Sequence, residues 1–387
     1  MDTSATWAEI DLAAIAHNTA VLKARCRPAR LMAVVKADGY GHGAAAVAQQ
    51  ALASGASMLA VARFREATAL RQAGIDAPIL IFGYTPADFA EQLAGLDLIQ
   101  AVASTDAARQ LADRARRAGK QIRVHIKIDT GMGRLGLLAD RLTMDPVAST
   151  TDCRRVAAEV ESIVRLPGLV PEGIFTHFAA ADSRDKLYTR RQFDIFTALL
   201  DTLARRGIRF ELRHAANSAG IIDLPETRLD MVRAGIALYG LYPSGEVDRG
   251  KVLLRPAMSL KSRIVHLKKV PAGFKLSYGL THATASATVI ATVAAGYADG
   301  VSRLLSNRGS MLVHGKAAPI IGRVCMDLCM LDIGHIPEAQ LNDEVVIFGR
   351  QGGGCISADQ IADLLNTINY EVVTGITARV PRVYLHP

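Results

Sequence analysis

Up to about residue 240, this 387-residue chain alternates short apolar runs with stretches of helical period, and this alternation limits its possible folds most. A short apolar run between turn residues is typical of a buried parallel strand, and the stretch that follows is typical of the helix leading to the next strand. Eight such units in roughly 230 residues predict a (β/α)8 barrel. The expected strands are Leu31–Lys36, Ser57–Val61, Pro78–Phe82, Leu98–Ala103, Ile122–Ile128, Leu169–Thr176, Phe210–His214 and Asp230–Arg233.

A doubly wound open sheet could use the same alternation of strands and helices. The first apolar run is not followed by the GxGxxG turn that binds dinucleotides. The missing turn argues against a dinucleotide-binding fold and favours the barrel, although the order of the strands is not fixed by the pattern.

Beyond about residue 250 the sequence becomes rich in short β-like runs separated by glycine and proline. One helix is expected at Ser357–Leu365, opened by a serine cap. We therefore expect two domains, a barrel over 1–246 and a mainly β domain over 247–387. The β-like runs are Met258–Val270, Ser286–Ala294, Met311–Val313 and Glu344–Phe348.

Composition narrows the classes of function. The net charge is +8, but the basic residues are dispersed and only one tryptophan is present, so nucleic-acid binding is weakly supported. No apolar stretch is long enough to span a bilayer, and the first residues lack a signal sequence, so we expect a cytoplasmic protein without membrane contact. The five cysteines follow no metal-binding spacing, so we expect reduced thiols and no metal site.

One lysine stands where chemistry is expected. Lys36 follows the apolar run Leu31–Val35 and precedes a glycine-rich turn, Gly39-Tyr40-Gly41. Because a lysine at a buried strand end loses solvation, its pKa falls and its amine becomes a nucleophile for carbonyl compounds. A lysine that merely extends to solvent is the structural alternative.

Other polar residues follow the expected strands at the same end. In a barrel, the carboxyl ends of the strands form the active site, and the last two loops often bind phosphate. Ser218 and the amides around Gly235 and Ile236 fit such a phosphate pocket. A nucleophilic lysine with a phosphate pocket suggests pyridoxal phosphate, and arginines at the same end suit an amino-acid carboxylate. These residues are Lys36, Lys127, Asp129, Arg134, His177, His214, Asn217, Ser218 and Arg233.

Nine motifs, found in order along the chain, resemble those of the alanine racemase family. They are VVKADGYGHG, KIDTGMGRLG, THFAAAD, ANSAG, VRAGIALYG, LSYG, AAGYADG, GRVCMDLCM and INYE. The resemblance extends nearly from end to end and implies a pyridoxal-phosphate enzyme with an N-terminal barrel and a C-terminal β domain. It also implies a homodimer with shared active sites, alanine as the substrate, and D-alanine for peptidoglycan synthesis as the product.

The resemblance implies two catalytic residues. Lys36 resembles the lysine that binds the cofactor and acts as one proton-transfer base. Tyr278 resembles the second base, which acts on the other face of the substrate Cα from the partner subunit. Without the motif, Tyr278 would be interpreted as an ordinary half-buried strand residue.

Further roles also rest on the resemblance. Arg233 is expected to face the pyridine nitrogen, and Arg134 the cofactor oxygen and the substrate carboxylate. Lys127 resembles a lysine that is carbamylated in many members, and its carbamate would position Arg134. The remaining expected contacts are Tyr40, Asn217, Ser218, Gly235, Ile236 and Tyr370 for the cofactor, Met326 and Tyr297 for the substrate, and His177, His214, Arg303, Arg323 and Asp327 as cofactor or supporting residues.

Three alternatives stay open. The alternative nearest to an alanine racemase is a serine or broad-spectrum amino-acid racemase. Against it, the tyrosines expected near the substrate favour an amino acid with a small side chain. A decarboxylase on the same barrel would have a carboxylate where this chain has Arg233. A non-catalytic pyridoxal-phosphate carrier would consist of the barrel alone, without a domain that supplies Tyr278.

Overall fold

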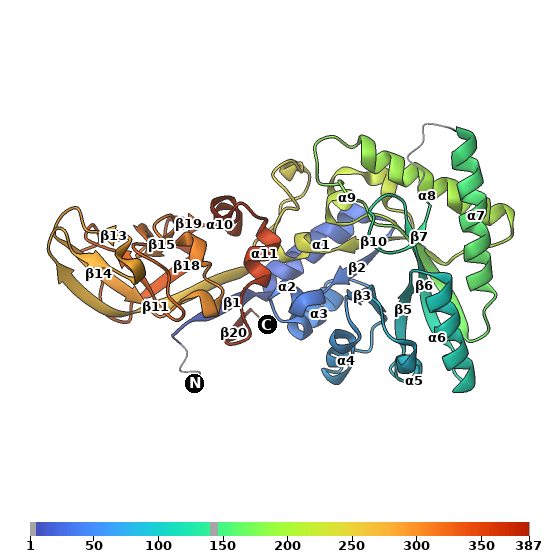
Figure 1. The fold of residues 1–387 in the computed structure, drawn as a ribbon, viewed down its shortest axis with the longest axis horizontal. Helices are drawn as coiled ribbons and strands as arrows, with labels where there is room; N and C mark the ends of the chain where they lie inside the picture. Colours follow the sequence, from blue (N-terminus) through green and yellow to red (C-terminus); the bar gives the residue numbers. More distant parts are fainter. Residues whose placement is uncertain (1–4, 140–145, 387) are drawn as a thin grey trace. The chain divides into compact units, whose positions relative to one another are not determined.

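The computed structural model describes residues 5–139 and 146–386 (Figure 1). The chain divides into two compact units. The barrel unit contains Ala14–Gly39 and Ala44–Arg255, and the C-terminal unit contains Pro256 onward together with Tyr40–Gly43 and the segment up to Ala13. The single boundary expected after residue 246 stays a prediction.

The barrel unit contains a closed ring of eight parallel strands, which confirms the predicted barrel and rules out the open sheet. The ring closes where β10 pairs with β2, with Val232 opposite Leu31. A short strand, β7 (Leu137–Leu138), is added beside the ring. In order around the ring, the strands are β2 (Arg30–Val34), β3 (Met58–Val61), β4 (Ile79–Ile81), β5 (Leu98–Val102), β6 (Ile122–Asp129), β8 (Leu169–Phe175), β9 (Leu212–His214) and β10 (Met231–Ala234).

Helix α1 precedes β2, the first strand of the ring, and the other helices connect the strands of the ring. All residues of β3, β4 and β5 are buried, as expected for parallel strands with one face to the barrel interior and one to the helices. The basic helix α6 is capped by Ser104 and exposes its arginines on the side opposite its buried alanines and leucine. The helices are α1 (Leu12–Cys26), α3 (Ala44–Ala53), α4 (Phe64–Gln72), α5 (Ala90–Gly95), α6 (Thr105–Arg117), α7 (Pro146–Val164), α8 (Leu187–Arg205) and α9 (Ser218–Asp223).

The C-terminal unit is mainly β-structure, as predicted. Its longest strand, β11 (Met258–Val270), pairs with β18 (Glu344–Gln351), with β14 (Thr288–Val293) and with the N-terminal strand β1 (Trp7–Asp11). β1 also pairs in parallel with the last strand, β20 (Arg382–Leu385), so the two ends of the chain share one sheet.

Shorter elements complete the C-terminal unit. The predicted serine cap is confirmed, because Ser357 Oγ accepts a hydrogen bond from the Gln360 amide at the start of α10. The elements are β12 (Lys275–Leu276), β13 (His282–Ala283), β15 (Ser310–Val313), β16 (Lys316–Pro319), β17 (Cys329–Asp332), β19 (Gly354–Ile356), α10 (Ala358–Leu365) and α11 (Asn369–Thr374). Across residues 5–139 and 146–386, no helix has both the length and the apolar character needed to cross a bilayer.

Candidate active site

Lys36 lies at the start of a left-handed turn, two residues beyond the end of β2. The sequence places it as the last residue of the strand, but the strand ends at Val34, and the Val35 amide makes one more ladder bond to the Ala60 carbonyl at 2.8 Å. The following residues form α2 (Lys36–Tyr40), in which Ala37 and Asp38 have φ of 52° and 51°. Because left-handed backbone costs roughly 1–2 kcal/mol per non-glycine residue, other contacts must hold this turn.

A carboxylate from α4 holds the turn in place. Glu66 Oε1 accepts a hydrogen bond from the Ala37 amide at 2.6 Å, and its Oε2 accepts from the amides of Ala62 and Arg63. Asp38 Oδ1 accepts from the Ala44 amide at 2.9 Å and so ties the turn to α3. Sequence reasoning missed Glu66, although its position in the first turn of a helix was a usable signal.

The electrostatics of Lys36 agree with the sequence-based expectation. Burial lowers the pKa of its amine, the charge of Arg134 lowers it further, and Glu66 opposes both effects. A larger fraction of the amine is therefore neutral at neutral pH than in an exposed lysine.

The carboxyl end of β6 holds a second group of charges. Although partial burial opposes ionisation, backbone amides hold the pKa of Asp129 below its usual range. Its two carboxylate oxygens accept hydrogen bonds from the amides of residues 131–134, at 2.8–3.1 Å, and this fixes the loop that carries Arg134. Burial, with the charges of Arg134 and Arg233, lowers the pKa of the buried Lys127 to about 8.

Arg233, on β10, is the centre of a buried polar cluster. Its Nη1 lies 3.0 Å from His214 Nδ1, and its Nη2 lies 3.1 Å from His177 Nδ1. Nη2 also donates to the carbonyl oxygens of Thr176 and Ala215. The structure thus brings together Arg233, His177 and His214.

The two histidines of this cluster are neutral at neutral pH. Burial, reinforced by the charge of Arg233, lowers the pKa of His177 and of His214 well below the usual range. Burial and the charge of Arg134 lower the pKa of Arg233 to about 9, so the guanidinium remains the cation of the cluster.

The loops after β9 and β10 meet at Ser218. Ser218 Oγ accepts hydrogen bonds from the amides of Gly235, at 2.9 Å, and Ala237, at 3.3 Å. Asn217 caps α9 by accepting from the Gly220 amide at 3.0 Å. Because Oγ is an acceptor in both contacts, the Ser218 hydroxyl can still donate its hydrogen to an anion. Ile236 is buried beside Gly235 at the end of β10.

The first loop and the last helix meet in the C-terminal unit. Tyr40 is buried, and its ring lies 6.1 Å from that of Tyr370 between centroids. Arg382 Nε donates to the Gly41 carbonyl at 2.9 Å, which joins the loop to β20. Burial raises the pKa of the Tyr40 phenol, so this group is a hydrogen-bond donor and not a base.

Three predicted site residues of the C-terminal unit are exposed. Tyr278 is 71% exposed, Met326 53% and Tyr297 42%. The turns that carry Tyr297 and Met326 contact each other, because the Tyr297 and Ala298 amides donate to the carbonyls of Cys325 and Met326 at 3.0 Å. Exposed aromatic and thioether side chains of this size are typical of a surface that meets a partner or a ligand.

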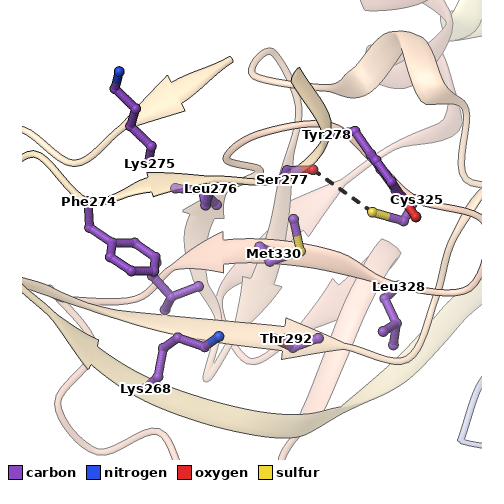
Figure 2. A pocket seen from close by; sticks show the side chains of 11 residues that line it. Lys268, Phe274, Lys275, Leu276, Ser277, Tyr278, Thr292, Cys325, Leu328 and Met330 are labelled. Carbon is purple, nitrogen blue, oxygen red and sulfur yellow. Dashed lines mark hydrogen bonds between the residues drawn. The ribbon is translucent and has the colours of Figure 1, made fainter. Parts of the chain in front are cut away.

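Tyr278 follows a strained residue. Ser277 has φ 64° and ψ 177°, a conformation found almost only in glycine, and its Oγ donates to the Arg323 carbonyl at 2.8 Å. Ser277, Tyr278 and Cys325 line a pocket of about 510 Å³, and Figure 2 marks the contact from Ser277 Oγ to Cys325 Sγ. The hydrogen bond to Arg323 therefore holds the backbone from which Tyr278 projects.

The remaining predicted residues also lie in the C-terminal unit. Asp327 accepts a hydrogen bond from Arg379 Nη2 at 2.8 Å, and the same arginine donates to the buried Asp299. Arg303 is exposed in a short 3-10 turn, and Arg323 is half-buried. The predicted residues thus form two groups, one on each unit of the chain.

Comparisons with known proteins agree along the whole chain. Residues 10–243 match the family described as alanine racemase, N-terminal domain, and residues 257–384 match alanine racemase, C-terminal domain. A protein named alanine racemase from Desulfosudis oleivorans is 56% identical over 385 residues, which cover 99% of this chain and 97% of that protein. A solved alanine racemase from Clostridium difficile 630 has a TM-score of 0.92 at 39% identity and covers 100% of this chain and 97% of its own. The alanine racemase from Bacillus anthracis with bound L-Ala-P has a TM-score of 0.91 at 37% identity, with 100% and 96% coverage.

Glu66→Ala tests the support of the left-handed turn. We expect the free energy of unfolding to fall by about 2–3 kcal/mol, because the substitution leaves three backbone amides without their acceptor. Urea unfolding followed by circular dichroism measures this change. Glu91→Ala, at an exposed position of α5, is the matched control and should change it by less than about 0.5 kcal/mol. Equal effects at the two positions would contradict the assignment.

Proposed function

The chain belongs to the alanine racemase family, and from this we propose that its active site combines the barrel unit of one subunit with the C-terminal unit of a partner subunit. Its activity is the interconversion of L- and D-alanine, an isomerase reaction, in a family that depends on pyridoxal 5'-phosphate. The observation that carries the proposal is the exposure of Tyr278, 71%, in a unit separate from Lys36.

The residues at the barrel mouth fit the cofactor. Lys36, Lys127, Arg134 and Arg233 carry cationic groups. The charge of Arg134 lowers the pKa of each of the other three, and Arg233 and Lys36 also lower that of Lys127. A phosphate and a substrate carboxylate would relieve this repulsion. When bound, pyridoxal phosphate supplies an aldehyde for an amine and a ring that withdraws electrons from Cα. The residues that would hold it are Lys36, Tyr40, Arg134, His177, Asn217, Ser218, Arg233, Gly235, Ile236 and Tyr370.

Arg233 would face the ring nitrogen of the cofactor. Its guanidinium is held by His214, His177 and two carbonyl oxygens, so it is fixed in place before any ligand binds. At about 4 Å and an effective dielectric of about 20, repulsion between this cation and a protonated ring would be roughly 4 kcal/mol. Arg233 would therefore keep the ring nitrogen unprotonated and moderate electron withdrawal from Cα.

Two bases would move the Cα proton. The Lys36 amine, with its lowered pKa, would take or return the proton on one face, and the Tyr278 phenol of the partner subunit would do so on the other. A phenol with a pKa near 10 needs roughly 4 kcal/mol of anion stabilisation to act as a base at neutral pH. His177 accepts from Arg233 at Nδ1, so its proton is on Nε2, where it could be donated to a phenolate.

Lys127 would carry a carbamate. Carbon dioxide reacts with neutral amines, and a pKa of about 8 makes the neutral form accessible. The amine nitrogen would bond to the carbon of carbon dioxide and release one proton to solvent. The resulting anion would replace the repulsion between Lys127 and Arg134 with attraction, and so position Arg134 for the substrate carboxylate.

The substrate would be contacted from the partner's side by Met326 and Tyr297. The residues that would support these contacts are Arg303, Arg323 and Asp327. The aromatic ring of Tyr297 favours a small side chain on Cα, so alanine is preferred over serine or larger amino acids. The reaction would take place in the cytoplasm, and its product, D-alanine, would be used for peptidoglycan synthesis.

Tyr278→Phe tests the division of labour between the bases. We expect loss of Cα proton exchange from L-alanine to exceed the loss from D-alanine, because the phenol would act on the L-enantiomer. Solvent deuterium exchange followed by NMR measures both. Lys36→Ala is the companion variant and should abolish the cofactor linkage that borohydride reduces. Equal losses from both enantiomers with Tyr278→Phe would remove the assignment.

Mixing two inactive variants tests the shared site. In a hybrid dimer of Lys36→Ala and Tyr278→Phe subunits, one site would carry both substitutions and the other neither. An equal mixture, exchanged under mild denaturant, should therefore regain about a quarter of wild-type activity, since about half the dimers are hybrids with one intact site. A mixture as inactive as its components, despite proven subunit exchange, would show that each site lies within one chain.

Labelling with 13C-bicarbonate tests the carbamate. We expect a carbamate 13C resonance in the wild type that grows between pH 7 and pH 9 at constant dissolved carbon dioxide, because the neutral fraction of Lys127 rises through its pKa of about 8. Lys127→Met should lose the resonance, and Lys120→Met, at an exposed position, should keep it. A resonance that survives Lys127→Met would disprove the assignment.

A further inference from the structure

Arg233 is one end of a row of four polar side chains that crosses the interior of the barrel. We call this row, Arg233–His214–His125–Glu172, the relay. Arg233 Nη1 lies 3.0 Å from His214 Nδ1, and His214 Nε2 lies 2.9 Å from His125 Nδ1. His125 Nε2 then lies 3.7 Å from a carboxylate oxygen of Glu172. These four side chains come from β10, β9, β6 and β8, and both histidines are completely buried. The site described above uses only the first two.

The proton positions along this chain follow from the chemistry of its first member. A guanidinium has no acceptor, so Arg233 donates and His214 Nδ1 is unprotonated. Burial keeps His214 neutral, so its proton is on Nε2 and is donated to His125 Nδ1. His125 must then be neutral as well, with its own proton on Nε2, directed toward Glu172. Each donor therefore points away from Arg233 and toward the carboxylate.

Glu172 supplies the negative end of the chain. Its side chain is 16% exposed, and Arg123 Nη1 lies 3.6 Å from the same carboxylate oxygen that faces His125. The neighbouring His125 lowers the pKa of Glu172 and burial raises it, and with the charges of Arg123 and Arg30 the pKa lies below its usual range. Within the described residues neither His125 Nε2 nor Glu172 Oε2 has a partner at hydrogen-bond distance, and at 3.7 Å the two atoms lie just beyond that distance from each other.

The barrel has space for the imidazole of His125 only because residue 173 is glycine. A Cβ at Gly173 would lie 2.6 Å from His125 Nδ1. On the other side, the ring of Phe175 stacks on that of His214, with centroids 4.7 Å apart and an interplanar angle of 4°. The two imidazoles therefore have defined places in the core and do not merely fill space.

We propose that His125 and Glu172 are positioning residues that fix His214 as the Nε2–H tautomer, and thereby hold the Arg233 guanidinium in its orientation toward the cofactor ring. The opposite tautomer would place the Nδ1–H of His214 against an N–H of Arg233, and the guanidinium would lose this partner. The proposal rests on the proposed role of Arg233, but the tautomer itself is a property of the protein without cofactor.

NMR of the cofactor-free protein tests the tautomer directly. Two-bond 1H–15N spectra of the histidine rings should show both His125 and His214 neutral with the proton on Nε2. A His214 ring that is protonated on Nδ1, or charged, would overturn the proposal. This readout does not depend on racemisation, so the relay can be tested even if the proposed function fails.

Substitutions at His125 separate positioning from packing. His125→Asn places an amide oxygen near the former Nδ1 and can still accept from His214, whereas His125→Leu fills the space without an acceptor. In the cofactor-loaded dimer we expect His125→Leu to lower kcat for alanine roughly tenfold, with KM little changed, and His125→Asn to recover most of the loss. Equal losses with both variants, or no loss with His125→Leu, would overturn the positioning role.

Glu172→Gln tests the last of the four polar side chains. It also keeps the proposal testable if His125→Leu does not fold. It removes the charge with little change of shape, and we expect His214 to show a mixture of tautomers and kcat to fall several-fold. Glu211→Gln is the matched control, since Glu211 is exposed and pairs with Arg30 outside the relay. A pure Nε2–H tautomer and unchanged kcat in Glu172→Gln would show that Glu172 has no such role.

Discussion

The concentration of positive charge at one end of the barrel is the constraint on which the rest of this site depends. Burial lowers the pKa of Lys36, Lys127 and Arg233, and the charge of Arg134 lowers each of them further. Arg233 and Lys36 also lower the pKa of Lys127. Such a cluster is unfavourable in the free protein and becomes favourable when anions enter it. Charges that repel one another in this way would select a ligand with a phosphate and a carboxylate.

The carboxylates near these cations offset their charges only in part, and they also bind backbone amides. Glu66 raises the pKa of Lys36 and Asp129 that of Lys127, but both amines keep a lowered pKa. Glu66 accepts from the Ala37 amide of the left-handed turn and from the amides of Ala62 and Arg63, which precede α4. Asp129 accepts from four amides of the loop that carries Arg134. Each carboxylate stabilises a loop whose backbone geometry would otherwise be costly. The cationic side chains are thus positioned by their loops while their charges stay available.

The C-terminal unit presents a different arrangement. Tyr278, Tyr297 and Met326 are exposed, but the backbone beneath them is constrained by hydrogen bonds such as that from Ser277 Oγ to the Arg323 carbonyl. Exposed side chains on a rigid backbone are suited to complete a site on another molecule, because little order is lost on association. This arrangement supports the proposal of a site shared between two subunits.

The eight barrel strands, the β-rich second unit and the placement of Lys36 and Arg233 near strand ends could be predicted from the amino-acid sequence, because the burial of neighbouring residues leaves a local periodicity. The sequence did not reveal that Tyr40–Gly43 and the N-terminal strand belong with the C-terminal unit, nor that Glu66 holds the turn after Lys36. Only the tertiary structure decided that His125 would meet His214, 89 residues away, and that Glu172 would end their chain. The reason is that such contacts depend on the closure of the ring and the register between strands, and a pattern of apolar residues along one strand carries no information about either.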